Sequence, residues 1–130
     1  MQTLWIALGA LAGLAAVAMA ALAAHGLHGL DTARLAMVHS AIEMQIWHAL
    51  ALLICGLWAP RGGRLANGAG GAFTLGLLTF CGALYTLGLY EVDLGVVAPI
   101  GGTLLLLGWA MLGVSAFVAR QRFEPPSHTT

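Results

Sequence analysis

The stretch HSAIEMQIWHALALL (39–53) decides how this chain is interpreted. It carries a glutamate, a glutamine and two histidines, yet it continues without interruption into aliphatic residues. An α-helix needs about 20 apolar residues to cross the hydrocarbon core of a bilayer, and the run from about Val38 to Trp58 has that length. We therefore expect a membrane-spanning helix that holds ionisable side chains in apolar surroundings.

The composition of the whole chain agrees with a membrane protein. Its 130 residues are 60% hydrophobic and 8% charged, and none is lysine. Soluble domains carry about 25% charged residues, so this surface is suited to lipid. The formal net charge of zero provides no basic surface for nucleic acid. The lipid bilayer is thus the expected environment, and nucleic acid is not an expected partner.

Four apolar runs are long enough to span a membrane. We expect spans at about residues 4–24, 38–58, 70–90 and 96–119, followed by a short polar tail at 120–130. Short connections between neighbouring spans favour an antiparallel four-helix transmembrane bundle, an all-α polytopic fold. The first run is longer than the apolar core of a signal peptide and follows no positive side chain. The glycine-rich segment 61–71 predicts a flexible turn between the second and third spans.

The arginines indicate the orientation of this bundle. Arg61 and Arg64 lie between the second and third spans, and Arg120 and Arg122 follow the fourth. Only Arg34 lies on the opposite side. Because cytoplasmic loops carry the excess of positive charge, this distribution places both termini in the cytoplasm.

Small residues are expected to hold the spans together, because lipid is as apolar as leucine and close backbone contact must supply the attraction. The 18 glycines are therefore interpreted as packing positions. Asp31 is expected to cap a helix that starts near Thr32. Cys55 and Cys81 are expected to be unpaired thiols, because their predicted depths in the membrane differ by about 10–15 Å.

His25, Glu43, Gln45 and His48 form the candidate ligand or proton site. At about 100° per residue, Gln45 and His48 share one face of their helix, whereas Glu43 shares another with His39. Two interpretations stay open. A neutral His48 donates to a backbone carbonyl and fixes helix packing, with Glu43 protonated or paired with His25. Alternatively, these side chains face a cavity and bind a ligand, an ion or a proton. The metal and any cofactor are left unknown.

Trp109 falls near the middle of the fourth span, where its indole N–H needs an acceptor. Glu43, Thr79 and Thr86 are the candidate acceptors. Nucleophilic catalysis has no support, since no serine lies in a Gly-x-Ser-x-Gly motif and no acid–base pair is spaced to activate one. We therefore expect a protein that is not an enzyme.

Four segments together resemble a known family: ALAAHGL (21–27), IEMQIWHALALL (42–53), FCGALYTLGL (80–89) and VAPIGGTLLLLGWAML (97–112). They are similar to the YgdD-like small inner-membrane proteins, domain-of-unknown-function family 423, whose eukaryotic relative is transmembrane protein 256. The resemblance runs from about residue 4 to 120 and implies a four-span protein of the bacterial inner (plasma) membrane without an established activity. The positions that match the family's pattern are His25, Glu43, Gln45 and His48, together with the expected packing residues Gly82, Tyr85, Pro99, Gly101, Gly102 and Trp109.

Two functions are compatible with these features. The first is a non-enzymatic membrane protein that forms homo-oligomers or serves as an accessory subunit of a larger membrane complex. The alternative is the binding of a small ligand, such as a metal ion, haem, quinone, lipid or proton-coupled solute, through an intramembrane His/Glu site.

Overall fold

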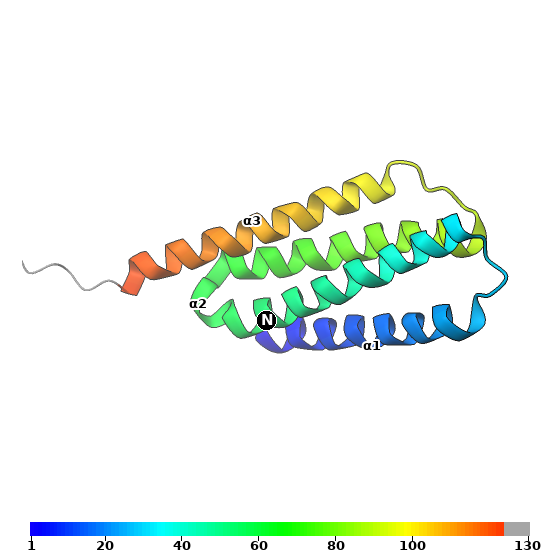
Figure 1. Cartoon of the computed structure of the whole chain (residues 1–130). Helices are drawn as coiled ribbons and strands as arrows, with labels where there is room; N and C mark the ends of the chain where they lie inside the picture. The colour runs from blue at the N-terminus through cyan, green and yellow to red at the C-terminus, as the bar shows by residue number, and fades with distance from the viewer. Residues whose placement is uncertain (124–130) are drawn as a thin grey trace, which may run out of the picture.

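The structure, a computed structural model, describes the backbone of residues 1–123 and the side chains through Arg120. The described residues form three α-helices: α1 (Gln2–Gly26), α2 (Thr32–Tyr90) and α3 (Val97–Phe123) (Figure 1). Each is long and apolar enough to cross a membrane. The all-α fold is thus confirmed. Residues 120–123, expected to be part of the polar tail, continue α3, and residues 124–130 lie outside the described part.

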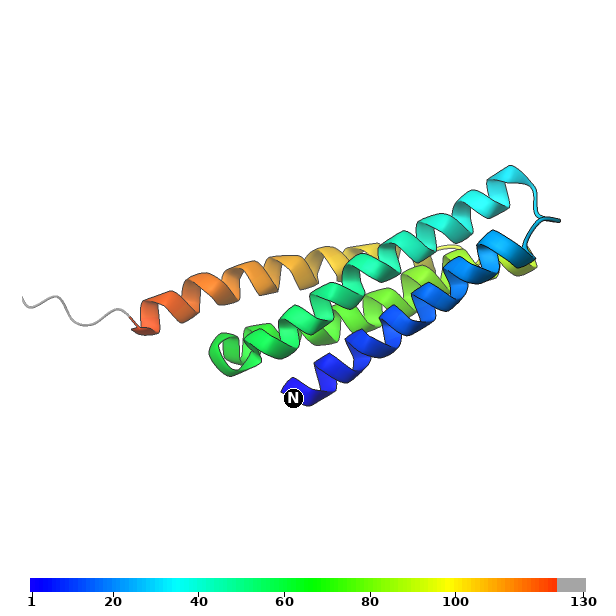
Figure 2. The ribbon, with the colours of Figure 1, turned by 60° about the horizontal axis from the view of Figure 1, so that its bottom comes forward.

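The expectation of four separate helices is wrong, because α2 includes both the second and the third predicted span in 59 residues. The glycine-rich segment 61–71 is helical rather than a flexible turn, and only Gly63 departs from helical geometry, with φ 58° and ψ −134°. The chain reverses there, so that the two halves of α2 run side by side in opposite directions (Figure 2). We call residues 32–62 the first leg and residues 64–90 the second leg.

The two legs are joined at the end far from Gly63 by Arg34. Its Nε and Nη2 donate to the carbonyls of Gly88 and Leu89, and its Nη1 contacts Oε1 of Glu91, each at 2.9 Å. The last carbonyls of a helix have no partner within the helix, so these bonds cap the second leg. The predicted cap is confirmed as well, because Asp31 Oδ1 accepts from the Arg34 backbone N–H at 2.9 Å.

Both outer helices pack on α2. At the Gly63 end, α1 inserts Trp5, which is 6% exposed and donates from Nε1 to Asn67 Oδ1 at 2.8 Å. The Trp5 ring lies directly over Gly70, where a Cβ would approach it to 2.6 Å. Phe73 and Leu52 fill the centre. Cys55 and Cys81 are free and buried, as expected.

The glycines expected to pack helices differ from one another. A Cβ on Gly101 would lie 2.5 Å from the backbone nitrogen of Phe80, so this glycine lets α3 approach the second leg. On Gly102 the nearest atoms would be 3.8 Å away, and on Gly82 none would lie within 4 Å. Neither glycine is needed for a close approach of helices: at Gly102 a Cβ would be at ordinary contact distance from the Phe80 ring of the second leg, and at Gly82 it would have open space. Pro99 lies in the first turn of α3, where its missing N–H costs nothing.

Replacement of Gly63 by alanine tests the reversal of α2. A side chain is strained at positive φ, so Gly63→Ala should lower the free energy of unfolding by about 1–3 kcal/mol. Gly71→Ala is the matched control, since Gly71 is helical and its Cβ would meet nothing within 4 Å. Thermal unfolding in detergent, followed by circular dichroism, should separate them; equal melting temperatures would show that no strain arises at residue 63.

The contact between α3 and the second leg is tested by two neighbouring glycines. Gly101→Ala forces a Cβ against the Phe80 backbone and should destabilise the fold by about 1–3 kcal/mol. Gly102→Ala has room and should leave stability unchanged or slightly higher, because alanine is the better helix former. The same unfolding measurement applies. Equal losses for both variants would contradict the close approach at Gly101.

Candidate functional site

The structure does not gather the four candidate site residues into one cavity. His25 and Glu43 are exposed, whereas Gln45 and His48 are buried. Glu43 and His48 are five residues apart and therefore point about 140° away from each other around the first leg. Of the two interpretations left open by the sequence, the one in which His25, Glu43 and His48 face one cavity does not match this arrangement, because two of the three side chains are exposed and the third is buried. What remains are two polar clusters, one at the buried His48 and one at the buried Gln45, and one exposed carboxyl group.

The first cluster surrounds His48, which packs against the rings of Phe73 and Trp109 with centroid distances of 5.6 and 6.1 Å. His48 Nδ1 lies 2.7 Å from the Met44 carbonyl oxygen, and Nε2 lies 3.2 Å from Trp109 Nε1. A carbonyl can only accept and an indole N–H can only donate. Both bonds are satisfied by the neutral ring with its hydrogen on Nδ1. Both ring nitrogens of His48 thus have a partner within the protein. The bond to a backbone carbonyl is the one expected if His48 serves helix packing.

The acceptor for Trp109 differs from those that the sequence suggested. The indole N–H donates to His48, not to Glu43, Thr79 or Thr86. The two threonine hydroxyls donate to carbonyls of their own leg, Leu75 and Ala83, at 2.8 and 2.9 Å. Such local bonds satisfy a threonine within its own helix and leave it no need of a partner elsewhere.

The second cluster joins α1 to both legs of α2. Gln45 Nε2 donates to the Ala12 carbonyl at 2.9 Å, and the Tyr85 hydroxyl donates to Gln45 Oε1 at 2.8 Å. The role of Tyr85 in packing thus has a specific form, a hydrogen bond between the legs. Sequence reasoning missed this pairing because the two residues lie 40 positions apart. The isolated polarity of each within an apolar span was the available signal.

An apolar cavity of about 370 Å³ lies beside this cluster, between α1 and the second leg. Gln45, Tyr85 and Gly82 form part of its wall. Because Gly82 adds no side chain, it leaves this space open.

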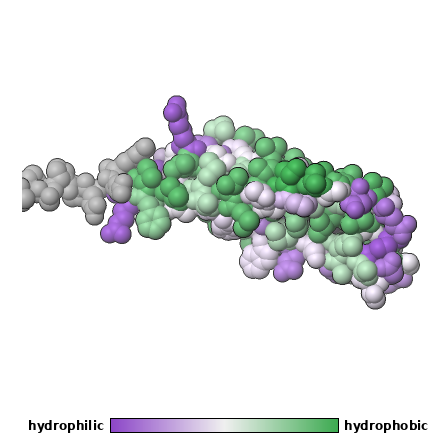
Figure 3. All heavy atoms as spheres, turned by 90° about the horizontal axis from the view of Figure 1, so that it is seen from above, coloured by the Kyte–Doolittle hydropathy of each residue, from purple (hydrophilic) through white to green (hydrophobic). Residues whose placement is uncertain are grey.

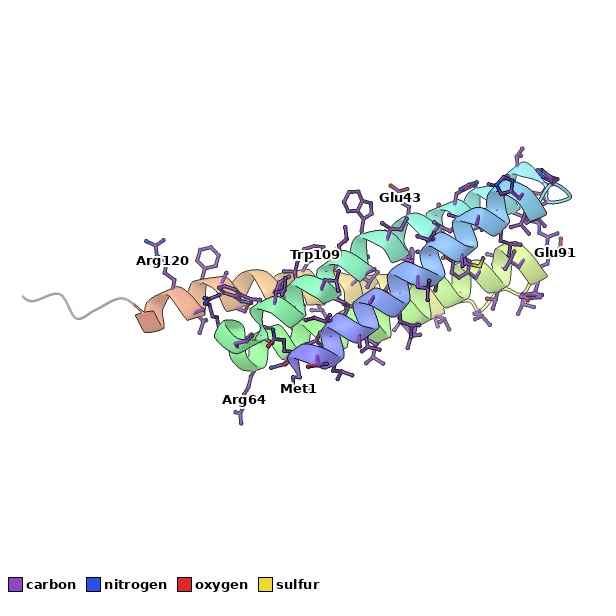
Figure 4. All side chains as sticks on the ribbon, turned by 90° about the horizontal axis from the view of Figure 1, so that it is seen from below. Met1, Glu43, Arg64, Glu91, Trp109 and Arg120 are labelled. Carbon is purple, nitrogen blue, oxygen red and sulfur yellow. The ribbon has the colours of Figure 1, made fainter. Side chains whose placement is uncertain are left out.

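Glu43 occupies the opposite side of the first leg, where it projects away from the bundle (Figure 4). It lines an open hollow of about 380 Å³ with His39, Ile42, Ile46 and Trp47. Among residues 1–120, Glu43 forms neither a salt bridge nor a side-chain hydrogen bond. The salt bridge in this part of the chain joins Arg34 to Glu91. Nor do any three His, Cys, Asp or Glu side chains in the described part group to hold a metal ion.

Removing the donor of Trp109 tests the first cluster. Trp109→Phe leaves His48 Nε2 without its partner and should lower the free energy of unfolding by about 1 kcal/mol, the size typical of hydrogen bonds between membrane helices. Trp47→Phe is the matched control, since Trp47 is 59% exposed and bonds to no described residue. Chemical denaturation in detergent measures both. Equal effects would contradict a contribution from the Trp109–His48 bond.

Comparisons with known proteins give the chain its relatives. The family described as "Protein of unknown function (DUF423)" matches residues 19–102. A UPF0382 membrane protein of Staphylococcus haemolyticus is 39% identical over 84 residues, which cover 64% of this chain and 69% of the relative. A UPF0382 membrane protein of Haemophilus influenzae is 36% identical over 87 residues, which cover 66% of this chain and 70% of the relative. A UPF0382 membrane protein of Bacillus subtilis is 32% identical over 85 residues, covering 63% and 69%. No solved structure matches.

The matched range is narrower than the resemblance expected over residues 4–120. It includes Glu43, Gln45 and His48 but ends before Trp109. A match over more than half of the chain, to relatives that are membrane proteins, establishes the family. The chain belongs to the DUF423 family of uncharacterised integral membrane proteins.

Proposed function

We propose that the chain crosses the bacterial inner (plasma) membrane four times with both termini in the cytoplasm, and that it acts without catalysis, by association. The partner is a second copy or a subunit of a larger membrane complex. The hollow around Glu43 is the surface at which it associates. The observation that carries this proposal is the exposed Glu43 on a helix side that is otherwise suited to lipid.

Helix lengths support four crossings. Each leg of α2 measures about 40 Å or more at 1.5 Å per residue, which exceeds the roughly 30 Å of the hydrocarbon core. The surface in Figure 3 is apolar along the bundle, and its hydrophilic residues gather mainly toward the two ends. Gly63 then lies at one membrane surface and the Arg34–Glu91 ion pair at the other.

The distribution of charge supports the orientation. Figure 4 shows Arg64 and Arg120 toward one end of the bundle and Glu91 at the other. The free arginines of the described part, Arg61, Arg64 and Arg120, are exposed at the Gly63 end, whereas Arg34 is neutralised by Glu91. By the positive-inside rule this end, which also holds Met1, faces the cytoplasm.

The position of Glu43 argues for a protein partner. It lies about 16 Å along the first leg from Thr32, which places it inside the apolar zone. An acidic side chain facing lipid costs about 3 kcal/mol at the centre of a span and less toward its ends, and such residues normally face protein or water. Beside it, Trp47 is 59% exposed and Ile46 40% exposed. An aromatic and aliphatic hollow that also holds His39 and Glu43 is the kind of surface that a partner helix covers.

The alternative of ligand or proton binding through His25, Glu43 and His48 has lost its geometric basis, because these side chains do not meet. Catalysis has no better support. The buried Ser115 donates to the Leu112 carbonyl at 2.6 Å and accepts from Trp58 Nε1 at 2.9 Å, so its hydroxyl is fully engaged.

The experiment is native mass spectrometry of the protein released from membranes in mild detergent, with and without cross-linking in the membrane. The wild-type chain should appear as an oligomer or with a partner subunit. Trp47→Ala and Glu43→Lys should weaken association about tenfold or more. Phe117→Ala is the matched control, because Phe117 is an exposed aromatic residue on α3, outside the hollow. A wild-type chain that is monomeric even after cross-linking would refute the proposal.

A further inference from the structure

The apolar cavity beside Gln45 has no role in the association proposed above. It lies between α1, which contributes Leu8, Leu11 and Ala12, and the second leg, which contributes Leu77 and Leu78. Its volume of about 370 Å³ falls within the 300–1,000 Å³ range of small-molecule sites. Gln45 and Glu43 point about 160° apart around the first leg, so the cavity and the hollow are separate surfaces.

The polar side chains at this cavity bond within the protein. Tyr85 donates to Gln45, and Gln45 donates to α1, as described above. The Thr74 hydroxyl donates to the Gly70 carbonyl at 2.8 Å, and the Cys81 thiol donates to the Ala41 carbonyl at 3.4 Å. The wall of the cavity is therefore mainly aliphatic, and it offers few free polar groups to which a water molecule could hydrogen-bond. Such a wall suits a hydrocarbon occupant.

The shape of the cavity limits that occupant to a thin chain. The cavity extends between α1 and the second leg as far as Gln45 and Leu52 of the first leg, which are 9% and 1% exposed. A helix with its side chains is about 10–12 Å wide and does not enter between two packed helices. Leu77 lies midway between Gly63 and Tyr90, at the depth where the tails of bilayer lipids are found.

We propose that this cavity binds one acyl chain of a membrane phospholipid. Gly82 is then a residue of the site rather than of the helix packing, because a Cβ there would meet no atom within 4 Å. A larger side chain at this position would project into the cavity edge without disturbing a helix contact. Ala15 forms part of the wall on α1 and is also exposed, so a larger residue there narrows the same space from the other side.

The test is photolabelling in vesicles of phosphatidylethanolamine and phosphatidylglycerol that contain a phospholipid with a diazirine in the middle of one acyl chain. Exposed residues such as Leu78 are labelled by bulk lipid in any case. Labelling of the buried Leu52 and Gln45, mapped by peptide mass spectrometry, is diagnostic, because only a chain inside the cavity reaches them. Leu105, 2% exposed and outside the cavity lining, serves as the negative position.

We expect Leu52 and Gln45 to be labelled in the wild-type protein, and labelling to fall at least fivefold in Gly82→Leu and in Ala15→Leu. Gly113→Leu is the matched control, because Gly113 is exposed on α3 and its Cβ would also meet nothing. It should keep the labelling. Circular dichroism verifies that each variant is folded. Absent labelling of Leu52 and Gln45 in the wild type, or labelling that persists in both cavity variants, would overturn the proposal.

Discussion

The reversal of α2 at Gly63 is the constraint on which the rest of the structure depends. Because a single residue leaves helical geometry, two long apolar segments become adjacent and antiparallel without an intervening loop. The paired legs then provide the surface on which α1 and α3 pack. Pro60, three residues earlier, lacks a backbone N–H and therefore weakens the helix just before the chain reverses. The contacts between the two legs, such as the Tyr85–Gln45 hydrogen bond, follow from this arrangement.

The polar side chains obey a second constraint, the absence of water in the apolar zone. Threonines bond to carbonyls of their own helix, whereas Gln45, His48 and Trp109 bond across helices. No buried side-chain nitrogen or oxygen within the described part lacks a partner. Glu43 stands apart from this pattern because it is exposed. The difference is the physical reason for assigning His48 and Gln45 to folding and Glu43 to association.

Much of this architecture was predictable. Hydropathy and length alone identify the apolar segments, and Asp31 indicates the start of α2 because aspartate is a favoured N-cap residue. The course of the chain at residues 61–71 was not predictable, since glycines there are compatible with either a turn or a helix. The positive φ of Gly63, which reverses the chain, cannot be inferred from the sequence. The same limit applies to the glycines of α3. Gly101 and Gly102 are equivalent in sequence, yet a Cβ on Gly101 would clash with the Phe80 backbone, whereas a Cβ on Gly102 would be at ordinary contact distance from the Phe80 ring.

The site was predicted less well than the fold. Spacing along one helix correctly separated the face of Gln45 and His48 from that of Glu43. It gave no information on which side chain arrives from another helix, so the partners Tyr85 and Trp109 were missed or misassigned. Arg34 was noted only for its charge, and its binding of the final carbonyls of α2 depends on two residues more than 50 positions away.

The hairpin form of α2 also implies an order of events during folding. Residues near Gly63 are close along the chain, so contacts there close short loops, whereas the Arg34–Glu91 pair closes a loop of 57 residues. Loop-closure entropy rises with loop length, and the contacts nearest the reversal are therefore the least costly to form first. We therefore expect pairing of the two legs to spread from Gly63 toward Arg34, each turn shortening the loop that the next contact must close. The Arg34–Glu91 ion pair, at the end of the legs far from Gly63, is then expected to form last.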